Sequence, residues 1–367
     1  MRGLSIAATR IIKALLSIVH RGGSLPGQIG LKLDGNVLSK LKFDGVIVMV
    51  TGTNGKTSTS NLIADLFERA GRRVISNRRG DNMRAGIATT ILTHTTLGGR
   101  VKADAMVLEV DELNVRHLLP QLKVNAFVVT NFFRDQLDRA REMEQLIETI
   151  ENVLPDYEGT LILNANDPNV IRLADHAPKA NTCYFAGDRC GSSSETTAEA
   201  SEGKFCPRCG SRLKYTYFQY SHIGEFHCSN CAFATPSADV CLTDIDLEHR
   251  QFSWKQERFT AAQDGLYAIY NCAALCAVAH VFSLDPAQVR SVLDHAVQPW
   301  GRNEHFDFEG KTCILNLVKN PTGANEVMKV IESHPEPKAV LIVLNDHDQD
   351  GTAVSWLYAT HFEKILS

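Results

Sequence analysis

A glycine-containing loop between an apolar run and an amphipathic segment most constrains the fold of this chain. Residues 46–50 are apolar and mostly β-branched, residues 51–57 read Thr-Gly-Thr-Asn-Gly-Lys-Thr, and residues 61–67 carry apolar side chains at helical spacing. This order predicts a strand, a phosphate-binding loop and a helix. The backbone N–H groups and the dipole at the start of such a helix favour a bound anion.

The residue types in this loop suit a nucleoside triphosphate and a magnesium ion. Glycine lets the backbone approach phosphate oxygens, lysine supplies a positive charge, and the threonine after it offers a hydroxyl ligand for Mg²⁺. The loop is shorter than the common phosphate loop, because only two residues separate its glycines, and a solvated turn is the alternative interpretation. We predict that ATP is bound by Gly52, Thr53, Asn54, Gly55, Lys56, Thr57 and Ser58.

The composition is that of an enzyme-sized protein. The 367 residues, of which 44% are apolar, are enough for two or three domains with cores of their own. The formal net charge of −4 gives no reason to expect a nucleic-acid partner. No apolar run reaches the roughly 18 residues that would span a bilayer. We expect a cytoplasmic protein.

The N-terminal segment allows two interpretations. Residues 1–19 are apolar at helical spacing, but Arg10 and Lys13 interrupt them, which matches a secretory signal poorly. The first interpretation is a helix packed on the body of the protein. The second is a basic amphipathic helix that rests on a membrane surface, which would place the protein at the inner face of the membrane.

Four of the ten cysteines form two Cys-x₂-Cys hooks with 18 residues between them. This is the spacing of a zinc ribbon, in which the hooks deliver four thiolates to one Zn²⁺. A set of four Cys ligands leaves no open coordination position, so we expect a structural role; two unrelated thiol pairs are the alternative. The predicted ligands are Cys206, Cys209, Cys228 and Cys231, whereas Cys272 and Cys276 are predicted to be small core residues.

Apolar runs alternate with amphipathic segments through the first half of the chain. Strands are predicted at 46–50, 73–76, 106–110, 126–131 and 160–164, with helices at 57–70 and 135–153. Continuous apolar strands joined by helices indicate a parallel sheet covered on both faces. Polar residues that follow three of these strands, at 109–112, 131–138 and 164–167, are expected to converge near the phosphate loop, because ligands bind beyond the carboxyl ends of parallel strands. A carboxylate there would help to hold Mg²⁺.

These patterns divide the chain into an N-terminal helical segment (1–45), an ATP-binding domain (46–300) and a C-terminal domain (301–367). The ribbon is expected as an insert at about 188–240. A strand-helix-strand unit is predicted at 312–317, 323–333 and 338–344, and we expect this last domain to be incomplete at Ser367.

A set of motifs that covers nearly the whole chain resembles the Mur ligase family. They are residues 51–57, Leu-Glu-Val at 108–110, Thr-Asn-Phe-Phe-Arg-Asp-Gln-Leu-Asp-Arg at 130–139, Leu-Asn-Ala-Asn-Asp-Pro at 163–168, Tyr-Asn-Cys-Ala-Ala at 270–274 and Gly-Arg at 301–302. The four-Cys insert, Leu-Pro-Gly-Gln-Ile at 25–29 and Asn-Leu-Val-Lys-Asn-Pro-Thr-Gly at 316–323 are similar to the MurT type within it. This type lacks the N-terminal UDP-binding domain of other Mur ligases.

The resemblance implies an α/β fold: a P-loop-type parallel sheet flanked by helices, with the zinc-ribbon insert and a partial Rossmann-like C-terminal domain. It implies the synthetase half of an amidotransferase, which uses ATP to convert the D-glutamate α-carboxylate of the lipid II stem peptide to D-isoglutamine through an acyl phosphate. A separate class I glutaminase subunit, the partner in a heterodimer, would supply the ammonia. The resemblance assigns catalysis to Lys56, Glu109, Asn131 and Arg302, Mg²⁺ to Thr57 and Glu109, and nucleotide contacts to Asn271 and Arg302.

Four positions depart from the family pattern. Ala353 and Ala359 stand where the family commonly has Asp in its C-terminal domain, the first of which is thought to complete the glutaminase triad. Ala268 replaces an Asn, and Gln136 replaces a His that helps to hold a second metal. We therefore expect impaired coupling to the glutaminase. One alternative is a non-catalytic nucleotide-binding subunit that scaffolds or regulates a glutaminase; another is an amino-acid-adding ligase, against which the zinc insert argues.

Overall fold

The computed structural model describes residues 1–18, 23–78, 80–133, 140–197, 202–296, 302–318, 320–333, 337–344 and 355–365. Its centre is a nine-stranded sheet in the order β11-β10-β9-β6-β5-β4-β1-β3-β2. The seven strands from β9 to β2 in this order pair in parallel, whereas β10 and β11 add an antiparallel edge that the sequence patterns did not indicate. The strands are β1 (Val46–Thr51), β2 (Val74–Ser76), β3 (Ala105–Glu109), β4 (Ala126–Val129), β5 (Thr160–Asn164), β6 (Asn181–Gly187), β9 (Val240–Asp246), β10 (Gln251–Trp254) and β11 (Glu257–Thr260).

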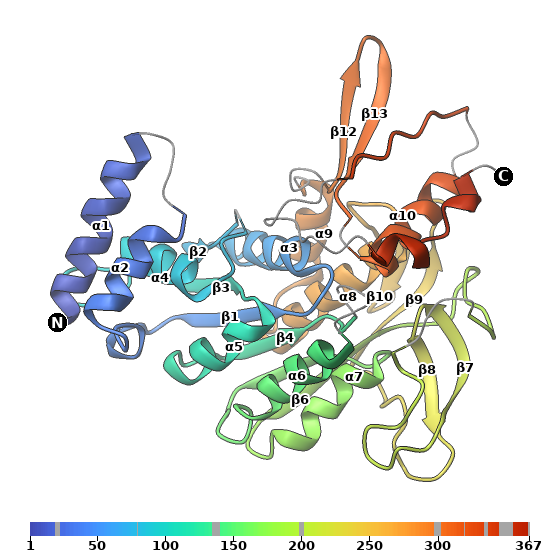
Figure 1. The fold of residues 1–367 in the computed structure, drawn as a ribbon, viewed down its shortest axis with the longest axis horizontal. Helices are drawn as coiled ribbons and strands as arrows, with labels where there is room; N and C mark the ends of the chain where they lie inside the picture. Colours follow the sequence, from blue (N-terminus) through green and yellow to red (C-terminus); the bar gives the residue numbers. More distant parts are fainter. Residues whose placement is uncertain are drawn as a thin grey trace.

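Helices cover both faces of this sheet, as predicted (Figure 1). Successive strand residues point to opposite faces, so Val48 and Val50 of β1 join one apolar cluster while Ile47 and Met49 join another. The first cluster includes residues of α3 (Lys56–Arg69), α8 (Leu266–Val281) and α9 (Pro286–Asp294). The second includes residues of α1 (Arg2–Ile18), α4 (Arg84–Thr93), α5 (Glu112–Leu118), α6 (Ala140–Glu151) and α7 (Pro168–Ile171). Cys272 and Cys276 of α8 are buried in the core, as predicted.

The N-terminal helix packs through Ile6 and two small polar side chains. In α1, Ser5 and Thr9 are buried against α2 (Leu25–Leu33), where the Ser5 hydroxyl donates to the Gly30 carbonyl oxygen at 2.7 Å. A Cβ atom at Gly30 would lie 2.3 Å from Thr9 Oγ1, so only glycine permits this approach. Among the residues that the structure describes, no helix is long and apolar enough to cross a bilayer.

Two hairpins lie outside the main sheet. The first, β7 (Leu213–Tyr220) with β8 (Ile223–Cys228), belongs to the connection between β6 and β9 and contains the strand predicted between the cysteine hooks. The second, β12 (Arg302–Phe308) with β13 (Lys311–Asn316), stands away from the body of the molecule (Figure 1). The helix α10 (Pro321–Ser333) follows it, and the short 3₁₀ helices at Ser355–Ala359 and Phe362–Ile365 contact α10.

The prediction of a strand at 338–344 is wrong for the described chain. These residues are apolar, but no sheet pairing forms there, and Leu341 and Val343 are exposed. A strand needs a neighbour that satisfies its backbone groups, and β13 pairs with β12 alone among the described strands. Among the described residues of the C-terminal domain, a Rossmann-like sheet is therefore not seen. The start of the helix predicted at 135–153 and residues 300–301 lie outside the described residues.

Candidate nucleotide site and metal centre

The predicted phosphate loop connects β1 to α3 and is held by the segment that follows β4. Thr53 N–H donates to the Asn131 carbonyl oxygen at 2.9 Å, and the Thr130 hydroxyl donates to the Asn54 carbonyl oxygen at 2.8 Å. The Thr53 hydroxyl accepts from Phe133 N–H at 3.0 Å. Because β4 lies beside β1 in the sheet, the loop is fixed by its neighbour before any ligand binds.

Both glycines of the loop adopt backbone conformations that other residues rarely reach. The φ angles are +125° at Gly52 and +83° at Gly55. A Cβ atom at Gly52 would lie 2.3 Å from Thr130 Oγ1, and one at Gly55 would lie 2.3 Å from Asn271 Oδ1. The glycines therefore allow both the curl of the loop and the approach of α8 to it.

Lys56 is the first residue of α3 and is buried beside the loop. Its ammonium group lies 3.0 Å from Glu112 Oε1 and also donates to the carbonyl oxygens of Gly52 and Thr53. Glu112 is buried as well, at the start of α5. A buried charge requires a partner, and this carboxylate provides it. Glu112 was expected near the loop but not as the partner of Lys56.

Glu109, the last residue of β3, has the properties of a cation ligand. Its exposed fraction is 3%, and its Oε1 atom accepts from Asn82 Nδ2 at 3.0 Å. Within the described part of the chain, its Oε2 atom is buried with no hydrogen-bond partner. Asn77 fixes the backbone of Glu109 by exchanging two hydrogen bonds with it. Thr57 lines the same pocket, so the predicted pair Thr57 and Glu109 fits the oxygen ligands that Mg²⁺ prefers.

Two of the other predicted site residues, Asn271 and Asn131, line the pocket, but they make different contacts. Asn271 lines the pocket from α8, and its Oδ1 accepts from the Thr59 hydroxyl at 3.1 Å. Asn131 also lines the pocket, but both ends of its amide bond the backbone of Asn54, so its observed contacts position the loop. Arg302 begins β12, and its side chain lies outside the described part of the structure.

The C-terminal segment closes the other side of this pocket. Asn320 is fully buried and its Nδ2 donates to Asn54 Oδ1 at 2.9 Å, which joins the segment to the phosphate loop. Its Oδ1 accepts from Gly323 N–H at 2.8 Å at the start of α10. Thr322 and Gly323 line the pocket, so a second helix N-terminus, with its positive dipole end, faces the site.

Only some of the polar strand ends reach the pocket. Glu109 and Asn131 line it. Asn164, Asn166 and Asp167 are buried and bond to groups outside the pocket; Asn164 Nδ2, for example, donates to the Thr130 carbonyl oxygen at 3.0 Å. These contacts stabilise the segments that form the pocket. Asp135, Gln136 and Asp138 lie outside the described residues.

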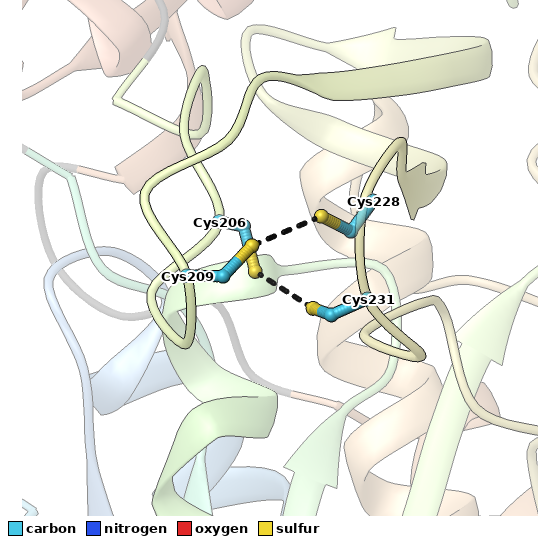
Figure 2. Close-up of side chains that lie close together, drawn as sticks. All are labelled: Cys206, Cys209, Cys228 and Cys231. Carbon is cyan, nitrogen blue, oxygen red and sulfur yellow. Dashed lines mark hydrogen bonds between the residues drawn. The ribbon is translucent and has the colours of Figure 1, made fainter.

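The four predicted zinc ligands lie together at the base of the β7–β8 hairpin. Their sulfur atoms all lie within 4.8 Å of one another, and none of the four is in a disulfide. Figure 2 shows the two hooks facing each other, with Cys209 and Cys228 sulfurs 3.4 Å apart and Cys206 and Cys231 sulfurs 3.6 Å apart. Tetrahedral Zn²⁺ with bonds of about 2.3 Å places thiolates about 3.8 Å apart. The residues therefore fit a four-coordinate metal ion.

The protonation of these thiols follows their surroundings. Hydrogen bonds from Ser211 lower the pKa of Cys209 to about 6, which favours the thiolate that a metal binds. Burial raises the pKa of Cys206 to about 12. A metal ion would therefore have to displace the proton from Cys206, so binding should release protons and weaken as the pH falls.

Comparison with known proteins shows to which family the chain belongs. A family model described as "Mur ligase middle domain" matches residues 50–238, and one described as "MurT ligase C-terminal" matches residues 317–367. The subunit MurT of lipid II isoglutaminyl synthase (glutamine-hydrolyzing) from Staphylococcus aureus strain N315 is 33% identical over 96% of this chain and 79% of its own length. The chain belongs to the Mur ligase family and is of the MurT type. It is an ATP-dependent ligase.

A further relative agrees with this assignment, and two solved structures share the fold. The corresponding MurT subunit of Streptococcus pneumoniae is 32% identical over 99% of this chain and 81% of its own length. A pseudomurein peptide ligase type C from Methanothermus fervidus shares the fold with a TM-score of 0.63 at 22% identity, covering 80% of this chain and 57% of that one. MurF from Thermotoga maritima, solved in complex with ADP, matches with a TM-score of 0.54 at 17% identity over 83% of this chain and 62% of that one.

The site of this Mur ligase contains residues to which the sequence patterns gave no role. Asn82 and Asn320 contact predicted site residues, and Glu112, which was expected near the loop, pairs with Lys56. Asn320 had a local signal, because an Asn before Pro often begins a helix. Tyr220, at the end of β7, also lines the pocket. It comes from the four-Cys insert, and nothing in its local sequence indicates this position.

Proposed function

We propose that this MurT-type ligase uses ATP to amidate the D-glutamate α-carboxylate of the lipid II stem peptide, giving D-isoglutamine. The names of the relatives at 32–33% identity support this reaction. The observation that carries the proposal is the pocket in which the phosphate loop, Glu109 and the start of α10 meet. These are a positive loop, a cation ligand and a second helix N-terminus around one space, as the transfer of a phosphoryl group requires.

The chemistry follows from the poor reactivity of a carboxylate. In the proposed sequence, a carboxylate oxygen attacks the γ-phosphorus of ATP and the bond to ADP breaks, which forms an acyl phosphate. The nitrogen of ammonia then attacks the acyl carbon, inorganic phosphate leaves, and the nitrogen loses a proton to give the amide. Mg²⁺ held by Thr57 and Glu109 would neutralise phosphate charge. Lys56 would shift from Glu112 to the terminal phosphates, and the N–H groups of the loop would orient them.

A class I glutaminase subunit is the proposed source of ammonia. The relatives are named as subunits of a glutamine-hydrolysing synthase, which supports a heterodimer. Ala359 lies in the 3₁₀ helix Ser355–Ala359, where its carbonyl oxygen accepts from Asn325 Nδ2 at 3.2 Å, and Ala353 lies outside the described residues. With alanine at both positions, neither residue offers a carboxylate to a glutaminase. We expect the ligase to use free ammonia more readily than glutamine.

An amidation assay tests the function directly. The purified chain is mixed with ATP, Mg²⁺, excess ammonia and a lipid-linked muropeptide whose second residue is D-glutamate with a free α-carboxylate. It should release ADP and convert this carboxylate to an amide, which mass spectrometry detects. The matched control is the same peptide already amidated, which should not be consumed. Glutamine should replace ammonia only when a glutaminase subunit is added. Nucleotide binding without turnover in excess ammonia would contradict the proposal and favour a non-catalytic scaffold.

We also propose that the protein works in the cytoplasm, at the inner face of the membrane, and that α1 contacts the lipid surface. Ser5 and Thr9 lie on the packed side of α1. Another side of the helix carries a stripe of apolar side chains that are exposed. Leu4, Ile11, Leu15 and Ile18 follow one another at i, i+7, i+11 and i+14 and are 58–76% exposed. Residues 1–33 contain five Lys or Arg residues and no Asp or Glu. An exposed apolar stripe in an acid-free segment suits an anionic bilayer.

Vesicle binding tests this surface. The wild-type chain should sediment with vesicles that contain phosphatidylglycerol and less with vesicles of phosphatidylcholine alone. The double variant Ile11→Asp with Leu15→Asp should lose at least about tenfold in vesicle affinity, because it places two charges in the apolar stripe. Leu113→Asp, an exposed leucine of α5, is the matched control and should bind as wild type. Equal binding by the double variant would exclude α1 as the contact.

A further inference from the structure

The tip of the metal-binding hairpin is buried inside the ATP-binding domain. The cysteine cluster lies at the base of β7–β8, while at the other end His222 and Ile223 are fully buried and Tyr220 is 5% exposed. Tyr220 and Ile223 belong to the apolar cluster formed by the sheet and α8. Gly224 exchanges two hydrogen bonds with Asn166, which follows β5. The hairpin is therefore a bridge from the metal centre to the carboxyl end of the sheet.

A buried charged triad holds this tip. His222 Nε2 lies 3.2 Å from Asp167 Oδ1, and His222 Nδ1 lies 3.2 Å from Glu202 Oε2. Burial alone would lower the pKa of His222, but the two carboxylates outweigh it and raise the pKa to about 10. The raised pKa favours a protonated ring between the two carboxyl groups, and such a buried arrangement is costly to break by removing one member.

The triad is connected to the phosphate loop by short contacts. The Oδ2 atom of Asp167 accepts from Phe132 N–H at 2.9 Å, and the His222 ring lies 4.7 Å from the Phe133 ring, centroid to centroid. Phe133 N–H in turn donates to the Thr53 hydroxyl. His222 thus reaches the loop through a single intervening residue.

Tyr220 brings the insert into the pocket itself. Its ring lies between those of Phe133, stacked at 5.9 Å, and Tyr270, edge-on at 5.7 Å. It lines the pocket together with Asn271, Tyr267 and Gln263. Aromatic side chains beside amide groups are typical of a pocket for a purine base, which packs against the rings and forms hydrogen bonds at its edge.

We infer that the metal-binding insert forms part of the nucleotide site, with Tyr220 as a wall that contacts the nucleoside of ATP and His222 as the positioning residue that holds Tyr220 and the phosphate loop together. This inference rests on the proposed function of the pocket. It gives the four-Cys insert a role beyond stability: the hairpin is anchored by metal at one end and presents a nucleotide-binding side chain at the other.

Calorimetric titration with ADP and Mg²⁺ tests the inference on the intact chain. Tyr220→Ala should raise the Kd for ADP about tenfold, because one base–aromatic contact contributes a factor of this order, while zinc content is unchanged. His222→Asn should raise the Kd for ADP and the KM for ATP. It should have less effect on the KM for ammonia. Thr216→Ala, exposed on the same hairpin, is the matched control and should match wild type in Kd.

The possible outcomes are distinct. If Tyr220→Ala and His222→Asn bind ADP as wild type does, the inference is overturned while the ligase proposal stands. If the wild-type chain does not bind ADP, the ligase proposal itself fails. If His222 had a purely structural role, His222→Asn would lower the melting temperature but leave the Kd for ADP unchanged when it is measured well below that temperature. This result would also overturn the positioning role of His222. Should His222→Asn not fold, Tyr220→Ala decides alone.

Discussion

Replacing Lys56 by alanine is expected to lower the rate of ATP turnover about a thousandfold, because a preorganised charge at the transferring phosphoryl group contributes a factor of that order. The side chain is buried at the start of α3, and it is the cation beside the phosphate loop with Glu112 as its counterion. ADP release in the presence of ammonia and the lipid-linked peptide measures the effect. Lys179→Ala, which removes an exposed lysine paired with Asp156, should retain wild-type turnover.

A second variant is needed as a control, because Lys56→Ala removes the cation that is paired with the buried Glu112 carboxylate. Such a group destabilises the fold and could by itself abolish turnover. The double variant Lys56→Met with Glu112→Gln removes both charges and keeps similar volumes, so it should fold with a melting temperature near that of wild type and still lack turnover. Undiminished ADP release by either variant would exclude the phosphate loop as the catalytic centre.

The parts of the site that were predictable are those with a local pattern. The strand-loop-helix at 46–67 and the two cysteine hooks each lie within a short segment whose spacing reflects one structure, and both formed as expected. The glycines were predictable for the same reason, since a tight loop needs their φ angles.

The parts that were missed depend on packing between distant segments. Asn320 meets Asn54 across 266 positions of sequence, and Tyr220 reaches the pocket only because the insert folds back onto the sheet. The same limit explains the strand wrongly predicted at 338–344. An apolar run favours a strand, but a neighbour in register decides whether one forms, and no local pattern reports that neighbour. In α1, small polar side chains against Gly30 form the packed side together with Ile6.

Removal of the metal from the cysteine cluster is the second change with a large expected effect. The insert has only a small apolar cluster, in which the cysteines pack with Leu213, Phe226 and Phe233 of the insert and with Ile171 of α7. A core of this size does not hold a fold without a cross-link or a metal, and a structural zinc contributes on the order of 10 kcal/mol to a small domain. Mass spectrometry under reducing conditions should find one zinc ion per chain.

Cys206→Ser should therefore release the zinc and unfold the base of the insert while the main sheet persists. Amide hydrogen exchange should become fast at residues 204–213 and 226–234, whereas β1 and β4, whose residues are in the central apolar clusters, should stay protected. Cys241→Ser replaces an exposed cysteine outside the cluster and should keep both zinc and protection. Because the hairpin tip is held separately by Asp167, His222 and Glu202, exchange there should rise less than at the base. Equal loss of protection at both ends would mean that the metal, rather than the buried triad, holds the tip; a wild-type chain without zinc would remove the ribbon assignment.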